Sequence, residues 1–346
     1  MGKKGKKAQA GKPKKLTAKD IRKRLDALIP MLEEELKGAD LFAPLPPTEP
    51  CPICLVPLSR FNEKSFYMAC CGSHVCQGCD TKGRLFETKQ FVASAEREGG
   101  FVRKCALCRE PIPDDKGFVR QLEALASRKS SPRAARALYN LGANYLEGDY
   151  GMPKDVFRAL EYFIQAADVG SAEACYDMGR IYHRGDGEFP VDIAKASLFF
   201  RAGALRGCIA SHFNAGNTEY FFLGNHEVGI RYWKIAAEAG DQQPLNCLRM
   251  VYSGKKNLPG KEFIAKDELD GIYRDCHEAQ ESVKSEERGK YCQRDTPVER
   301  LLDHLSKGKE IVDKDVLETL EAIMTSRNIR RLEDQLSNSF KFGGQS

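Results

Sequence analysis

Eight of the thirteen cysteines in this 346-residue chain fall within 58 residues, and this cluster limits the possible folds more than any other feature. It contains three Cys-x-x-Cys pairs, at Cys51–Cys54, Cys76–Cys79 and Cys105–Cys108, with Cys70 and Cys71 between the first two. Each Cys-x-x-Cys pair forms a tight turn that places two thiolates within reach of one tetrahedral Zn²⁺. A dense cysteine cluster in a reduced protein indicates metal binding rather than disulfides. The cluster therefore predicts two zinc ions.

The segment between the cysteine pairs cannot build a sizeable hydrophobic core. Its apolar residues are few and scattered: Leu55, Leu58, Phe61, Phe66, Val75, Phe86, Phe91 and Val102. Metal binding must therefore supply the missing folding free energy, which is roughly 10 kcal/mol or more for each structural zinc site.

Residues 50–113 resemble a RING finger. The matching residues are Cys-Pro-Ile-Cys at 51–54, Cys71-Gly72 before Val75-Cys76, Cys79, and Cys105-x-x-Cys108-Arg109 followed by Pro111. The resemblance implies a cross-brace, in which the first and third pairs bind one ion and the second and fourth pairs bind the other. We assign this zinc domain to residues 50–115.

The second pair departs from the RING pattern, which usually has Cys-Gly-His before its fifth ligand. Here Ser73, a poor zinc ligand, takes the place of the histidine after Gly72. Either Cys70 and Cys71 both bind, or His74 pairs with one of them. We favour the two cysteines.

Two further residues match positions that RING-type ubiquitin ligases use. In those ligases an apolar residue of the first turn contacts the ubiquitin-conjugating enzyme, and Ile53 stands there. A basic residue after the last ligand can hold ubiquitin in its reactive position, and Arg109 matches it. The proline often found inside the last pair is Ala106 here, which weakens the match. A RING ligase brings a charged conjugating enzyme and its ubiquitin together, so we expect no catalytic residue in this chain.

A repeat with a period of 37 residues begins after the cysteine-rich segment. The positions Gly142, Tyr145, Gly148, Asp155, Ala159 and Gly170 recur as Gly179, Tyr182, Gly185, Asp192, Ala196 and Gly207. A third copy runs to Gly240 and is four residues shorter, and a degraded fourth copy follows. Each unit predicts two antiparallel helices that must stack on their neighbours to bury their apolar faces.

The repeats resemble the Sel-like class of tetratricopeptide-like repeats. The signatures are Leu-Gly-x-x-Tyr at 141–145, Lys-Asp-x-x-x-Ala at 154–159 and Ala-Ala-x-x-Gly at 166–170. We expect residues 133–285 to form a helical repeat solenoid that binds another protein, whose identity the sequence does not give.

The remaining segments are polar or basic. We expect a basic disordered tail at 1–19, a short helix and proline-rich linker at 20–49, and a polar helical C-terminal tail at 286–346. Residues 1–50 hold twelve Lys or Arg and seven acidic residues, and the rest holds 42 of each, so the net charge of +5 lies in this N-terminal part. No aromatic residue interleaves the basic ones of the tail, which disfavours nucleic-acid binding.

The sequence thus predicts a mainly α protein: a small two-zinc cross-brace RING domain followed by an α-helical repeat solenoid. No apolar run reaches the roughly 18 residues that a transmembrane helix needs, so we expect a cytoplasmic or nuclear protein without a membrane partner. The leading hypothesis is a ubiquitin ligase that recruits a ubiquitin-conjugating enzyme and ubiquitin through its RING and a substrate through its repeats. The alternative is a non-catalytic interaction scaffold with structural zinc.

Overall fold

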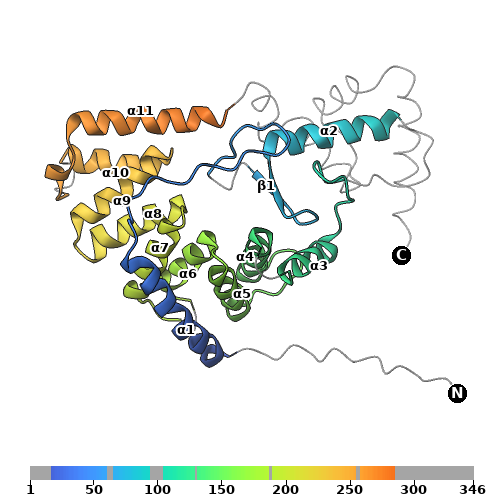
Figure 1. The fold of residues 1–346 in the computed structure, drawn as a ribbon, viewed down its shortest axis with the longest axis horizontal. Helices are drawn as coiled ribbons and strands as arrows, with labels where there is room; N and C mark the ends of the chain where they lie inside the picture. Colours follow the sequence, from blue (N-terminus) through green and yellow to red (C-terminus); the bar gives the residue numbers. More distant parts are fainter. Residues whose placement is uncertain are drawn as a thin grey trace, which may run out of the picture.

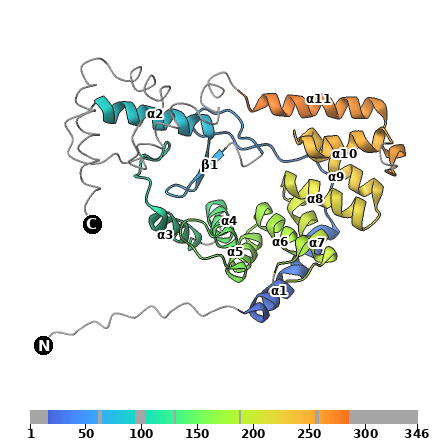
Figure 2. The same cartoon turned by 180° about the vertical axis from the view of Figure 1, so that it is seen from behind.

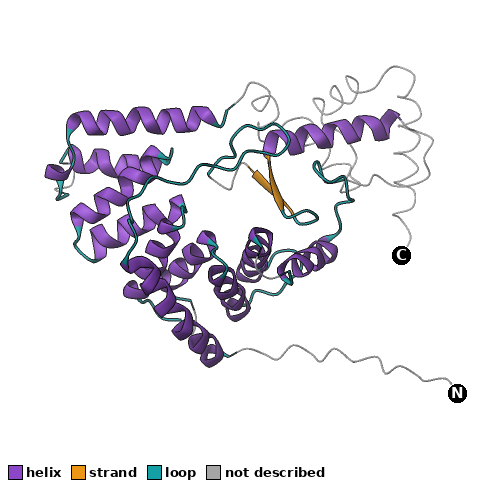
Figure 3. Cartoon of the chain, in the orientation of Figure 1, coloured by secondary structure: helices purple, strands orange, loops and turns teal. Residues whose placement is uncertain are grey.

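A computed structural model describes residues 17–60, 65–93, 104–128, 131–186, 189–254 and 258–284. The tail predicted for 286–346 and most of the basic tail predicted for 1–19 lie outside these residues. Helices dominate the described part, and its one sheet is a two-stranded hairpin (Figure 3). Of the helices described, none is long and apolar enough to cross a membrane.

The repeats form consecutive antiparallel helix pairs. The pairs are α4 (Pro132–Glu147) with α5 (Val156–Asp168), α6 (Ala172–Arg184) with α7 (Ile193–Leu205), α8 (Ile209–Asn217) with α9 (His226–Glu238), and α10 (Gln242–Tyr252) with α11 (Lys266–Ser282). Figure 1 shows these helices following one another along an arc. The predicted helical solenoid is therefore confirmed.

Side-chain caps at repeated positions set where the helices begin. Asp155 accepts hydrogen bonds from the N–H groups of Phe157 and Arg158, at 3.0 and 3.1 Å. Its counterpart Asp192 accepts one from the N–H of Lys195 at 3.0 Å. Each cap satisfies N–H groups that would otherwise lack a partner at the helix start, so the repeated aspartate fixes where α5 and α7 begin.

Each of the three repeats places a glycine of its first helix beneath an aromatic ring of its second. The pairs are Gly142 with Phe163, Gly179 with Phe200, and Gly216 with Trp233. A Cβ atom on any of these glycines would lie 2.5 to 2.6 Å from the ring.

The third repeat lacks four residues between its helices, and there the chain forms a π-helix, η2 (Thr218–Phe222). A short 3₁₀ helix, η4 (Lys261–Phe263), precedes α11.

The N-terminal helix α1 (Ala18–Lys37) packs on the solenoid against α5 and α7. Its apolar stripe, Ile21, Leu25, Leu28 and Leu32, belongs to the same buried cluster as the repeat helices. Arg206 of the solenoid also donates to Glu35 of α1, at 2.6 Å. The sequence indicated the helix, but its place in the solenoid core is a finding of the structure.

The cysteine-rich segment lies on the inner side of the arc, as Figures 1 and 2 show from opposite sides. It contains the antiparallel strands β1 (Ser65–Met68) and β2 (Ser73–Cys76), followed by α2 (Gln77–Ala93). A further helix, α3 (Asp115–Ala126), packs on α4 and connects this segment to the repeats. The segment that α3 covers is therefore helical and extends the solenoid toward the cysteines.

Candidate metal centre

The first and last Cys-x-x-Cys pairs fold into the same backbone turn. In each turn the residue after the second cysteine donates its N–H to the carbonyl of the first cysteine: Leu55 to Cys51 at 2.8 Å, and Arg109 to Cys105 at 3.0 Å. Leu55 and Arg109 both adopt the left-handed conformation, with φ of 59° and 64°. This shared turn points both thiols of a pair to one side, as metal binding requires.

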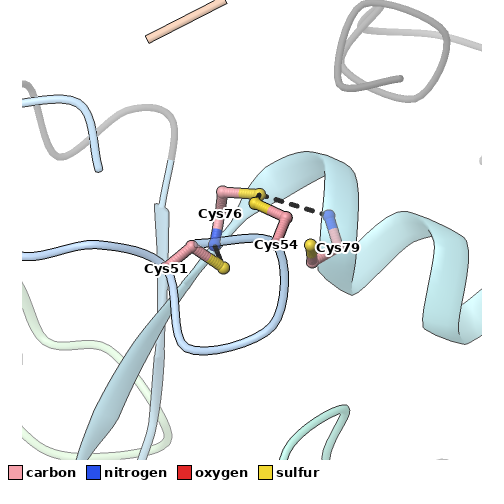
Figure 4. A group of neighbouring side chains, drawn as sticks. All are labelled: Cys51, Cys54, Cys76 and Cys79. Carbon is pink, nitrogen blue, oxygen red and sulfur yellow. Dashed lines mark hydrogen bonds between the residues drawn. The ribbon is translucent and has the colours of Figure 1, made fainter. Parts of the chain in front are cut away.

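The first thiol group combines the first and third pairs. It consists of Cys51 and Cys54 from the first turn, Cys76 at the end of β2 and Cys79 in the first turn of α2 (Figure 4). All four sulfur atoms lie within 4.8 Å of one another, and Cys54 Sγ lies 3.9 Å from Cys76 Sγ. The strand and helix that follow the first turn thus bring together cysteines that are 22 residues apart or more.

The second thiol group combines the second and fourth pairs. Cys70 and Cys71, in the turn between β1 and β2, meet Cys105 and Cys108, again with all four sulfur atoms within 4.8 Å. Cys71 Sγ lies 4.0 Å from Cys105 Sγ, and Cys70 Sγ lies 3.3 Å from Cys108 Sγ. The two groups are therefore interleaved along the chain.

His74, the alternative ligand considered from the sequence, lies outside both groups among the described residues. Its ring lies 5.2 Å from that of Tyr67, which is its partner across the hairpin. Burial lowers the pKa of His74 to about 4, with a smaller contribution from Arg136 of α4. The geometry thus brings Cys70 and Cys71 together, rather than His74, with the last pair.

The donor sets fit a soft, tetrahedral metal ion. Four sulfur ligands at about 2.3 Å from a tetrahedral zinc stand about 3.8 Å apart, close to the separations found here. Backbone N–H groups approach the sulfurs, including Cys76 N–H to Cys51 Sγ at 3.5 Å and Cys79 N–H to Cys76 Sγ at 3.4 Å. Such donors stabilise thiolates, the form that binds metal. Both groups can therefore hold a metal ion.

Burial and crowding disfavour the thiolate form at some positions of each group unless a cation is present. Burial raises the pKa of Cys70, and the neighbouring thiols of Cys108 and Cys105 raise it further. Burial likewise raises the pKa of Cys79, with Cys76 adding to the effect. Thiolates held this close repel one another, and a bound cation would offset that repulsion.

The two residues expected to contact partners lie at the surface beside the thiol groups. Ile53 is 42% exposed, and its neighbour Leu55 is 73% exposed. Arg109 is also exposed, but its Nη1 lies 3.0 Å from Oε1 of Glu87 on α2. The other oxygen of Glu87 accepts a hydrogen bond from the N–H of Lys104 at 3.2 Å. The role of Glu87 in holding α2 to the last turn was not evident from the sequence.

The hairpin turn that carries two of the thiols also packs on the solenoid. Ala69, immediately before Cys70, is buried in one cluster with Leu122 and Leu125 of α3 and with Leu141 of α4. Gly72, in the left-handed conformation, lies so close to Arg133 that a Cβ atom would stand 3.1 Å from its side chain. The turn that carries the second thiol group is therefore packed directly against α3 and α4 at the start of the solenoid.

Comparisons with known proteins bear on the helical part. The family model of the Sel1 repeat matches residues 135–171, 172–208 and 211–241, so the chain carries Sel1 repeats. Among solved structures, a Sel1 repeat protein from Oxalobacter formigenes is similar at 18% identity, over 58% of this chain and 75% of that chain, with a TM-score of 0.39. A search of curated proteins finds no match. The Sel1 match does not extend to the cysteine-rich segment, so the RING assignment rests on the residues themselves.

Proposed function

We propose that residues 50–115 are a RING-type domain with two structural zinc ions and that this protein is a ubiquitin ligase. The observation that carries the proposal is the interleaving of the thiol pairs, first with third and second with fourth. A domain with two consecutive metal sites would instead join the first pair to the second. Interleaving is the arrangement that the RING resemblance implies.

Zinc is the metal that these ligands fit best. Four thiolates in tetrahedral positions favour zinc or an iron–sulfur centre, and zinc is the usual ion in all-cysteine structural sites. Cys51, Cys54, Cys76 and Cys79 would hold one ion, and Cys70, Cys71, Cys105 and Cys108 would hold the other. When bound, zinc supplies folding free energy rather than reaction chemistry.

The surface beside the first thiol group supports contact with a ubiquitin-conjugating enzyme. Ile53 and Leu55 expose apolar side chains on a turn that the metal would hold rigid. Adjacent exposed apolar side chains on a fixed turn favour protein binding over a purely internal role. The ligase would bind the conjugating enzyme here, while the Sel1 repeats would bind the substrate protein.

The alternative is an interaction scaffold without ligase activity, and two observations favour it. Ala106 replaces the proline usual inside the last pair, and its side chain lies 3.4 Å from the Cβ position of Gly83 on α2. Arg109 is held by Glu87, which is only 8% exposed, so the guanidinium has a partner within the domain. Protein binding through the Sel1 repeats is common to both functions.

An autoubiquitination assay with the full-length, zinc-loaded protein and a panel of ubiquitin-conjugating enzymes tests the proposal. We expect transfer by at least one enzyme, and we expect Ile53→Ala to abolish it while metal analysis still gives two ions per chain. Val191→Ala is a matched control, because Val191 is an apolar residue 56% exposed on a solenoid loop. It should leave transfer unchanged.

The outcomes separate the two functions. If no enzyme of the panel transfers ubiquitin while both ions are bound, the protein is an interaction scaffold rather than a ligase. Transfer that persists in Ile53→Ala would mean that the ligase contacts its enzyme through another surface.

A further inference from the structure

A cavity of about 910 Å³ lies where three separate parts of the chain meet. Its walls come from the proline-rich linker at 38–50, from Ser59 and Arg60 at the edge of the described zinc domain, and from the ends of α9 and α11. Figure 1 shows the linker as a blue trace running past α9 toward β1. Ligand sites commonly have volumes of about 300–1,000 Å³ and form where structural units meet.

The linker wall of the cavity is apolar and fixed by contacts with the solenoid. The ring of Phe42 lies 5.0 Å from the ring of Tyr232 on α9. The guanidinium of Arg231 stands over the same Phe42 ring, 3.8 Å from its centre. Leu45 of the linker and Ile235 of α9 continue this wall. The apolar surface is thus pre-formed, which lowers the entropic cost of binding a ligand.

Among the described residues, Arg60 gives the cavity a cation without a counter-ion. Its guanidinium donates to the carbonyl of Pro46, and within the described chain no carboxylate pairs with it. Burial lowers the pKa of Arg60, because desolvation disfavours its charged form. A guanidinium has five N–H donors in a geometry that matches a carboxylate, and among the described residues the carbonyl of Pro46 is the one acceptor for them.

Another wall presents hydrogen-bond acceptors. Glu238 of α9 makes no ion pair in the described chain, and burial raises its pKa, with Asp275 and Glu268 adding to the effect. Asp241 accepts the N–H of Gln243 at 2.9 Å, and burial raises its pKa as well. A ligand that only offers negative charge would be repelled by these carboxylates. A peptide has N–H donors for them in addition to a carboxylate for Arg60.

We propose that this cavity binds the extended C-terminal segment of a partner protein, with its terminal carboxylate on Arg60. Its apolar side chains would lie on Phe42 and Leu45, and its N–H groups would face Glu238. The site differs from the surface beside Ile53, so it does not depend on ubiquitin transfer. It would give the scaffold and the ligase alike a defined class of partner.

Fluorescence anisotropy on the full-length, zinc-loaded protein tests the proposal. The probes are a fluorescein-labelled Leu-Pro-Leu-Val peptide with a free C-terminal carboxylate and the same peptide with a C-terminal amide. The acid should bind about tenfold more tightly than the amide. Arg60→Gln should remove that preference by weakening only the acid, whereas Arg60→Lys should retain part of it. Arg274→Gln, an exposed arginine of α11 outside the cavity, should change neither peptide.

Binding of the acid and the amide is compared for the wild type and for Arg60→Gln. This comparison distinguishes loss of the carboxylate contact from a general loss of structure. Equal binding of acid and amide would overturn the proposal, as would absence of binding up to about 1 mM. An Arg60→Gln effect of equal size on both peptides would also overturn it, because the cation would then serve only the fold. Displacement of the labelled peptide by dodecanoate at lower concentration than by the unlabelled acid would assign the cavity to amphipathic acids instead.

Discussion

Replacing Gly179 with alanine should destabilise the solenoid, although alanine is the better helix former. The new Cβ would lie 2.6 Å from both Cδ1 and Cε1 of the Phe200 ring. Phe200 is fully buried, and its ring contacts those of Tyr176 and His183, with centroids 6.1 and 6.2 Å away. The ring therefore has little room to move away from the added methyl group.

Two opposing terms set the size of the effect. Alanine gains about 1 kcal/mol over glycine in helix propensity. Adding a methyl group to a closely packed contact costs about 1–3 kcal/mol. At a separation of 2.6 Å the clash should be at the upper end of that range. We therefore expect a net loss of about 1–2 kcal/mol in the free energy of unfolding.

Urea unfolding followed by circular dichroism measures this change, and the chain offers a control of opposite sign. Gly271 lies within α11, and its Cβ position meets nothing closer than a side-chain nitrogen of Arg274 at 3.8 Å. Gly271→Ala should therefore stabilise by up to about 1 kcal/mol. If Gly179→Ala stabilised the protein to the same degree, the close contact would be refuted. In a Phe200→Leu background, Gly179→Ala should cost less stability than it does in the wild type, because the two residues are in contact and their effects are not additive.

Two further predictions concern α1 and the second thiol group. Leu25 is only 2% exposed, so Leu25→Ala should lower the free energy of unfolding by about 2–5 kcal/mol. Met31 on the same helix is 56% exposed, so Met31→Ala should change that free energy by no more than about 0.5 kcal/mol. Thermal unfolding of both variants measures the difference. Cys70→Ser should lose one of the two zinc ions, whereas His74→Ala should keep both, as measured by metal analysis. Loss of an ion from His74→Ala but not from Cys70→Ser would make His74 the ligand instead.

The repeat helices could be predicted from the sequence because their determinants are local. Asp155 and Asp192 recur one period apart, and each caps the helix that follows it. Gly142 and Gly179 recur at the same period, and each is overlaid by a ring from its own repeat. A period of 37 residues therefore carries both the helix boundaries and the close helix contact within each unit.

The contacts between distant segments could not be predicted in this way. The apolar stripe of α1 indicates that this helix must be covered, but nothing in the stripe specifies α5 and α7 as the covering helices. The pairing of Arg109 with Glu87 depends on how α2 lies against the last turn, which spacing does not encode. The choice between His74 and two cysteines likewise depends on the hairpin turn, whose conformation follows from Gly72 and from packing on α4.

Removal of metal should loosen α3 and α4 before it affects the far end of the solenoid. Ala69 is 3% exposed in a cluster with Leu122 and Leu141, and the next two residues belong to the second thiol group. Without a cation the four thiols no longer fix this turn, so Ala69 should leave the cluster and expose its neighbours. Hydrogen exchange after chelation should therefore rise in residues 115–147, while α9 and α10, which belong to a separate buried cluster, should keep their protection. Unchanged exchange in α3 and α4, with both ions removed, would show that the hairpin packs on the solenoid independently of the metal.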